Sequence, residues 1–153
     1  MTSVRRVRLG APLAFAICTT LGGCAGPPET ALRYDIERDA ISRPLTDVPG
    51  DAVRGREVVV GRDANCLFCH TVPASGERFM GTIGPPLAGV GARFTAGQLR
   101  LRIVDPTRVN PEAAMPAYFR VDGLDRVAQN YRGRSILTAQ QVEDVVAYLM
   151  TLD

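Results

Sequence analysis

The chain has 153 residues, which is enough for one small domain and a short additional segment. Its 18 basic residues are all arginine, so no lysine is available as a metal ligand or a Schiff-base nucleophile. These arginines are balanced by 16 acidic residues, and this near-neutral charge leaves no basic surface of the kind that nucleic-acid binding requires.

The first 24 residues predict an export signal. Three arginines precede an apolar run at 9–21 that is too short for an ordinary membrane-spanning helix. "LGGC" at 21–24 resembles a bacterial lipoprotein cleavage box, in which Cys24 would become the lipidated first residue. Cleavage after Ala25 without a lipid is the alternative. We therefore expect a periplasmic protein, with the lipid anchor at Cys24 left open.

Residues 25–50 are rich in proline, glycine and charge, which predicts a flexible, loosely attached arm with one short helical piece. We expect the compact domain at 51–153. Its first element is a predicted helix over 51–60, with Asp51 near the N-cap. Three consecutive valines at the end of this segment would also suit a strand.

The sequence "CLFCH" at 66–70 contains the only histidine of the chain. Cys-x-x-Cys-His is the attachment sequence of c-type haem. Cys66 and Cys69 can each form a thioether with one of the two haem vinyl groups, and His70 then presents its imidazole to the iron. The motif predicts one covalently attached haem c.

Three other readings of this motif are weaker. A structural zinc site normally needs four cysteine or histidine ligands, and the mature chain would have only Cys24 to add to this cluster. A thioredoxin-like pair is expected beside a βαβ pattern, which the sequence lacks. A disulfide between Cys66 and Cys69 would leave His70 without an explanation.

The remaining sequence predicts helices separated by irregular loops. Eight glycines and prolines at 73–94 indicate backbone that wraps around something, and three prolines interrupt 105–120. Helices are predicted at 95–104 and at 138–149, because each begins with a Thr-x-x-Gln capping box. Apolar residues follow the i, i+3, i+4, i+7 pattern in the last segment. Such long loops in a compact domain are hard to justify without a cofactor.

The second axial ligand of the iron cannot be another histidine or a lysine of this chain. Methionine, water or a group from another chain remains, and methionine's soft thioether raises the potential of haem iron. Met80 has only a short path around the ring from His70, and Met150 suits a core position in the last helix. Met115, in a loop held by flanking prolines, is therefore our preferred ligand.

The motifs "CLFCH" and "IGPPL" (83–87), together with Met115 and the amphipathic last helix, resemble class I cytochromes c. The resemblance implies an all-α fold whose first and last helices cross near the haem, with Gly55 allowing the close approach. It also implies that the Pro85 carbonyl accepts a hydrogen bond from His70; the less favoured alternative is that this proline pair only stiffens a loop. Val59 stands where the family often has an aromatic residue.

A narrower resemblance covers roughly residues 41–153. "IGPPLAGVGARF", "RVNPEAAMPAYFR", "GLDRVAQNYRG" and "RGRSILTAQQVEDVVAYLMTL" resemble SoxX, the monohaem subunit of the SoxAX sulfur-oxidation cytochrome. The resemblance implies a SoxA-type partner that carries the catalytic haem, a SoxYZ carrier whose cysteine receives thiosulfate, and a small downstream electron acceptor. In this interpretation the chain receives the released electrons and has no catalytic residue of its own.

Two further functions stay open at this point. A free periplasmic monohaem carrier that serves an oxidase or another dehydrogenase would need the same haem motif. A haem-free lipoprotein binding module is disfavoured by the composition of the loops. The additional segment at 123–133 favours a subunit over a free carrier.

Overall fold

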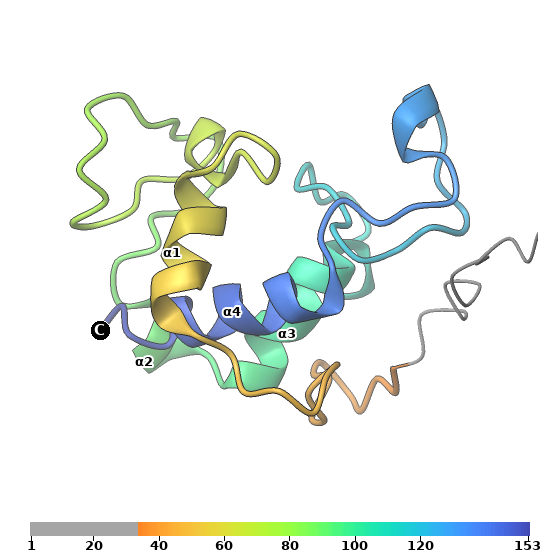
Figure 1. Ribbon diagram of the computed structural model, residues 1–153, viewed down its shortest axis with the longest axis horizontal. Coiled ribbons are helices and arrows are strands. Elements are labelled where there is room, and N and C mark those ends of the chain that lie inside the picture. The colour runs from red at the N-terminus through yellow and green to blue at the C-terminus, as the bar shows by residue number, and fades with distance from the viewer. Residues whose placement is uncertain (1–33) are drawn as a thin grey trace, which may run out of the picture.

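The computed structural model describes residues 34–153, and these form an all-α domain with long loops (Figure 1). The helices are α1 Ala52–Val60, α2 Val90–Arg93, α3 Ala96–Val104 and α4 Ala139–Leu149, with short 3-10 turns η1 Cys66–Phe68, η2 Pro106–Arg108 and η3 Gln129–Tyr131. This part of the chain contains no β-strand, which confirms the expected fold class. None of these helices is long and apolar enough to cross a membrane. The predicted export signal and Cys24 lie outside the described residues.

The three principal helices begin where the sequence predicts. The Asp51 side chain accepts hydrogen bonds from the backbone N–H groups of Val53 and Arg54 at 2.8 and 2.9 Å. The valine run is therefore helical, because this cap satisfies backbone donors that would otherwise lack partners. Both Thr-x-x-Gln capping boxes are present at the starts of α3 and α4.

Helices α1 and α4 make the principal helix–helix contact, and α3 packs beside α4 (Figure 1). A Cβ atom at Gly55 would collide with the backbone carbonyl of Asp144, so only glycine allows the two helices to approach this closely. Arg54 donates two hydrogen bonds of 2.8 Å to the Asp144 carboxylate. Burial raises the pKa of Asp144, but hydrogen bonds from Arg54 and the Asp51 backbone outweigh this effect and hold it below the usual value.

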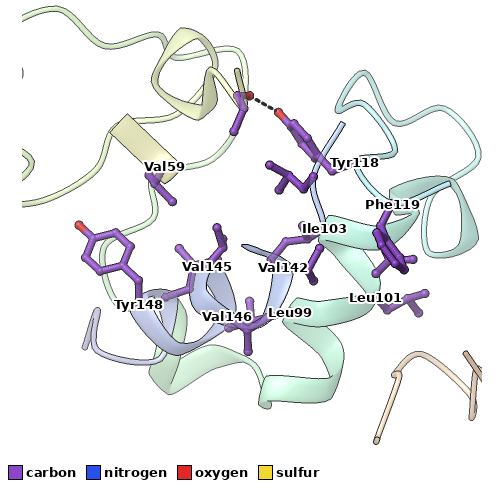
Figure 2. Close-up of a cluster of buried hydrophobic side chains, with 14 of the residues drawn as sticks. Val59, Leu99, Leu101, Ile103, Tyr118, Phe119, Val142, Val145, Val146 and Tyr148 are labelled. Carbon is purple, nitrogen blue, oxygen red and sulfur yellow. Dashed lines mark hydrogen bonds between the residues drawn. The ribbon is translucent and has the colours of Figure 1, made fainter. Parts of the chain in front are cut away.

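The core lies between these three helices and the loop that precedes α4 (Figure 2). Its labelled members are Val59, Leu99, Leu101, Ile103, Tyr118, Phe119, Val142, Val145, Val146 and Tyr148. On α4 the buried valines follow the predicted helical spacing, so the apolar face of this helix is confirmed.

The described part of the expected arm, residues 34–50, is not loose. The Ile41 side chain is only 1% exposed and belongs to the core. Its N–H donates to the Gly97 carbonyl at 3.0 Å, and its carbonyl accepts a hydrogen bond from Arg100 at 2.6 Å. The segment contains no helix, only a bridge between residues 37 and 40. Composition could not reveal this packing, because every partner lies far away in the sequence.

Helix α2 was not expected within the irregular stretch 73–94. It forms where Val90 becomes buried and Gly91 reaches the end of α4. The Gly91 N–H donates to the Leu152 carbonyl at 3.0 Å, and a Cβ at this glycine would lie 2.7 Å from the Met150 carbonyl oxygen. The short helix therefore depends on a tertiary contact rather than on a local sequence signal.

Candidate haem site

A tight turn after α1 positions the Cys-x-x-Cys-His motif. In η1 the backbone N–H groups of Cys69 and His70 both donate to the Cys66 carbonyl, at 3.1 and 3.0 Å. Asn65 begins this turn in the left-handed conformation, with φ of 49°. Both cysteines are free thiols, so each sulfur can add across a vinyl group.

The strap "IGPPL" fixes the orientation of the histidine ring. The Nδ1 atom of His70 lies 2.7 Å from the Pro85 carbonyl oxygen. A carbonyl only accepts hydrogen bonds, so Nδ1 carries the proton and the lone pair of Nε2 is free for a metal. A Cβ atom on Gly84 would collide with the imidazole ring, which explains why glycine precedes this proline.

An apolar cavity of about 260 Å³ lies between the Cys-x-x-Cys-His turn, the IGPPL strap and helices α1, α3 and α4. Cys66, His70, Pro85 and Met115 all line it, although they come from three separate segments of the chain. Figure 2 shows other side chains that line it, namely Val59, Leu99, Ile103, Tyr118 and Val145. Cys69 is half-buried and is not part of the cavity wall.

The three methionines of residues 34–153 occupy different environments. The Met80 sulfur lies outside the cavity wall and accepts hydrogen bonds from the Val72 N–H at 3.2 Å and the Ser75 hydroxyl at 3.5 Å. Met150 is the C-cap of α4 and is exposed. Met115 alone among them lines the cavity.

Burial favours the neutral forms of two groups near the motif. It raises the pKa of the Cys66 thiol to about 11. It also raises the pKa of the Tyr118 phenol well above the usual value for tyrosine. A thioether has no proton to lose, so Cys66 in this linkage suits the apolar wall. The Tyr118 hydroxyl donates to the Ala64 carbonyl at 2.7 Å and so joins the methionine loop to the haem motif. Tyr118 was missed in the sequence, where its only signal is its place three residues after Met115.

Two arginines that the sequence did not single out also border the cavity. Arg93 donates to the carbonyls of Ala88 at 2.7 Å and Pro86 at 3.1 Å, so it clamps the proline strap. The Arg102 guanidinium lies 4.3 Å from the centre of the Phe94 ring. Two cations at an otherwise apolar wall suit a haem, which carries two propionate carboxylates.

The residues present therefore fit a haem. The cavity is apolar, a thiol and an imidazole occupy its wall, and a thioether sulfur comes from a separate loop. Within the described residues, no group of three or more histidine, cysteine or acidic side chains is arranged to hold a metal ion by itself.

Comparison with known proteins agrees with this geometry. The family model for cytochrome c matches residues 52–153. A chain in the crystal structure of SoxXA from P. pantotrophus is 36% identical, with a TM-score of 0.72 over 78% of this chain and 93% of that chain. The chain belongs to the SoxX-type cytochromes c. This SoxX-type cytochrome carries one covalently attached haem c, and its function is electron transfer.

A second solved structure is also similar. The c-type cytochrome SorU from Sinorhizobium meliloti is 24% identical, with a TM-score of 0.43 over 66% of the SoxX-type chain and 88% of its own. No curated protein sequence matches the chain.

Proposed function

We propose that this SoxX-type cytochrome is the electron-transfer subunit of a SoxAX-type complex. In the proposed reaction, a bond forms between a cysteine sulfur of the SoxYZ carrier and the outer sulfur of thiosulfate. This step releases the thiol proton and two electrons, which a haem held by this chain would accept one at a time and pass to a small acceptor. The observation that carries the proposal is the 36% identity with a chain of SoxXA over nearly all of that chain.

We assign the roles of the site residues as follows. Cys66 and Cys69 would hold the haem through thioethers, His70 and Met115 would bind its iron, and the Pro85 carbonyl would orient His70. The shared cavity and the 2.7 Å contact between His70 and Pro85 support this assignment. The bound haem supplies a one-electron couple of its iron. If His70 and Met115 both bind the iron, thiosulfate would have no place on it, and the sulfur chemistry would belong to the SoxA-type partner.

Reconstitution tests this function. We expect no haem reduction when the purified cytochrome is mixed with thiosulfate alone. Reduction should appear once the SoxA-type subunit and the SoxYZ carrier are both added, and the haem absorption spectrum reports it directly. Omitting either component is the matched control. Rapid reduction by an unrelated dehydrogenase, without stable association with the SoxA-type subunit, would support a free carrier instead.

We further propose that the mature protein is periplasmic and acylated at Cys24, which lies outside the described residues. Two or more buried acyl chains hold a protein firmly at a membrane, since each buried CH₂ group contributes about 0.8 kcal/mol. Intact-mass measurement of the protein from its native host should show a chain that starts at Cys24 and carries lipid. A chain that starts at Gly26 without lipid mass would contradict the anchor and leave a soluble periplasmic form.

A further inference from the structure

Three large apolar side chains are exposed within or close to the haem motif. Phe68, Phe79 and Ile83 are 65%, 93% and 68% exposed, and we call them the apolar patch. The other large exposed apolar side chains of the described residues are distributed elsewhere along the chain: Val48, Val53, Val109 and Met150. Exposed clusters of this kind mark interaction sites, because isolated apolar residues are ordinary on protein surfaces but clusters are not.

Backbone hydrogen bonds hold the patch together. The Gly81 N–H donates to the Leu67 carbonyl and the Gly84 N–H donates to the Cys69 carbonyl, both at 2.8 Å. These bonds place the backbone of 81–84 alongside that of 67–69, in the yellow-green region that follows α1, with Phe79 two residues before Gly81 (Figure 1). A Cβ at Gly81 would collide with the Phe68 carbonyl, so glycine is required for this contact.

The segments that carry the patch contain few charged residues, and two arginines that reach them, Arg56 and Arg93, donate to the backbone carbonyls of Ser75, Pro86 and Ala88. Residues 64–76 and 79–92 contain no aspartate, glutamate or arginine, and only Glu77 and Arg78 stand between them. Depletion of charge and enrichment in aromatic residues characterise the buried cores of protein interfaces, and long-lived interfaces are the most apolar. Brief encounters with small redox partners rely more on charge, which steers the approach. A permanent subunit therefore fits this surface better than a transient acceptor does.

We propose that the apolar patch is the docking surface for the SoxA-type partner subunit, an inference that rests on the proposed function. The occupant should present an apolar, uncharged face that receives Phe79 and Ile83. Because the patch adjoins Cys69 and the strap that orients His70, a partner seated there lies next to the haem attachment motif. Electrons would then pass between the two subunits across an interface from which water is excluded.

The affinity of the holo-cytochrome for the purified SoxA-type subunit tests this proposal. We expect the double variant Phe79→Gln/Ile83→Gln to bind at least about tenfold more weakly, since truncated interface anchors commonly cost this much. Val53→Gln is the matched control, because Val53 is 71% exposed but lies at the opposite end of α1 from η1. This control should bind within about twofold of the wild type. The haem spectrum should stay unchanged in Val53→Gln and in the single variant Phe79→Gln, which lies outside the IGPPL strap and should also bind more weakly than the wild type.

The outcomes separate this proposal from the proposed function. Strong binding by the wild type and equal binding by the double variant would overturn the docking surface and leave the proposed function intact. No binding by the wild type would overturn both. A wild-type homodimer that the double variant dissociates, or wild-type binding to neutral phosphatidylcholine vesicles that the double variant loses, would assign the patch to a second copy or a lipid surface instead. Affinity that falls more than about tenfold between 50 and 500 mM salt would contradict apolar docking.

Discussion

Met115→Ala is expected to lower the midpoint potential of the haem by roughly 0.2 V, a fraction of the ~0.8 V range that axial ligands span. In the proposed ligation by His70 and Met115, loss of the soft thioether would remove the ligand that favours ferrous iron. The weak near-infrared absorption of the oxidised protein, which reports sulfur-to-iron charge transfer, should disappear. Spectroelectrochemical titration measures both changes on one sample. Because Met115 is half-buried in a loop rather than in a helix, we expect the fold to persist.

Met80→Ala and Met150→Ala are the matched controls. The Met80 sulfur already accepts two hydrogen bonds within its own loop, and Met150 lies exposed at the end of α4. Both variants should keep the near-infrared band and a potential close to that of the wild type. If Met80→Ala loses the band and Met115→Ala keeps it, the ligand assignment is wrong and the loop at 73–84 must approach the iron.

What could be predicted from the sequence depends on signals that are local in the chain. The capping boxes that begin α3 and α4 involve residues three positions apart, and their geometry is present as predicted. The Cys-x-x-Cys-His motif is equally local, because one turn must reach both vinyl groups and the iron. The close crossing of α1 and α4 at Gly55 was expected from the family resemblance. The structure gives the reason, because a Cβ atom at this position would collide with the backbone of α4.

What could not be predicted depends on pairs that are distant in the chain. Tyr118 reaches the carbonyl of Ala64, 54 positions earlier, and nothing in either segment identifies the other. Arg93 donates to the backbone carbonyls of Pro86 and Ala88, and these carbonyls come within its reach only in the folded loop. The proline and charge content of 34–50 resembles that of a linker, so composition alone did not show that this segment packs against the domain. Only the structure shows that Ile41 fills a core position.

Glu143→Gln is expected to destabilise the protein by about 3–5 kcal/mol, because it removes one partner of a buried ion pair. The side chains of Arg100 and Glu143 are each only 5% exposed. Arg100 donates to both carboxylate oxygens, at 2.7 and 2.8 Å, and an uncharged amide would leave its guanidinium as an unpaired buried cation. A loss of this size is a large share of the 5–15 kcal/mol that typically stabilises a domain. Guanidinium denaturation of the holo-protein, followed by far-UV circular dichroism, measures it.

The same pair anchors the arm, so the effect should also be visible there. Glu143 accepts a hydrogen bond from the Leu45 N–H at 2.8 Å, and Arg100 donates to the Ile41 carbonyl. We expect proteolytic cleavage within 34–50 to become faster in Glu143→Gln. The comparison variant is Arg54→Gln, which should lose less stability because the Arg54 side chain is half exposed in its pair with Asp144.

The double variant Arg100→Met/Glu143→Leu separates charge from packing. Replacing both partners leaves no unpaired buried charge, so it should recover part of the stability that Glu143→Gln loses. Recovery should stay incomplete, because the Ile41 carbonyl and the Leu45 N–H lose their partners, and each unsatisfied buried group costs about 1–3 kcal/mol. Cleavage of the arm should therefore remain fast even where stability recovers. A cost below about 1 kcal/mol for Glu143→Gln, with the arm still protected, would show that burial of Ile41 alone holds the arm in place.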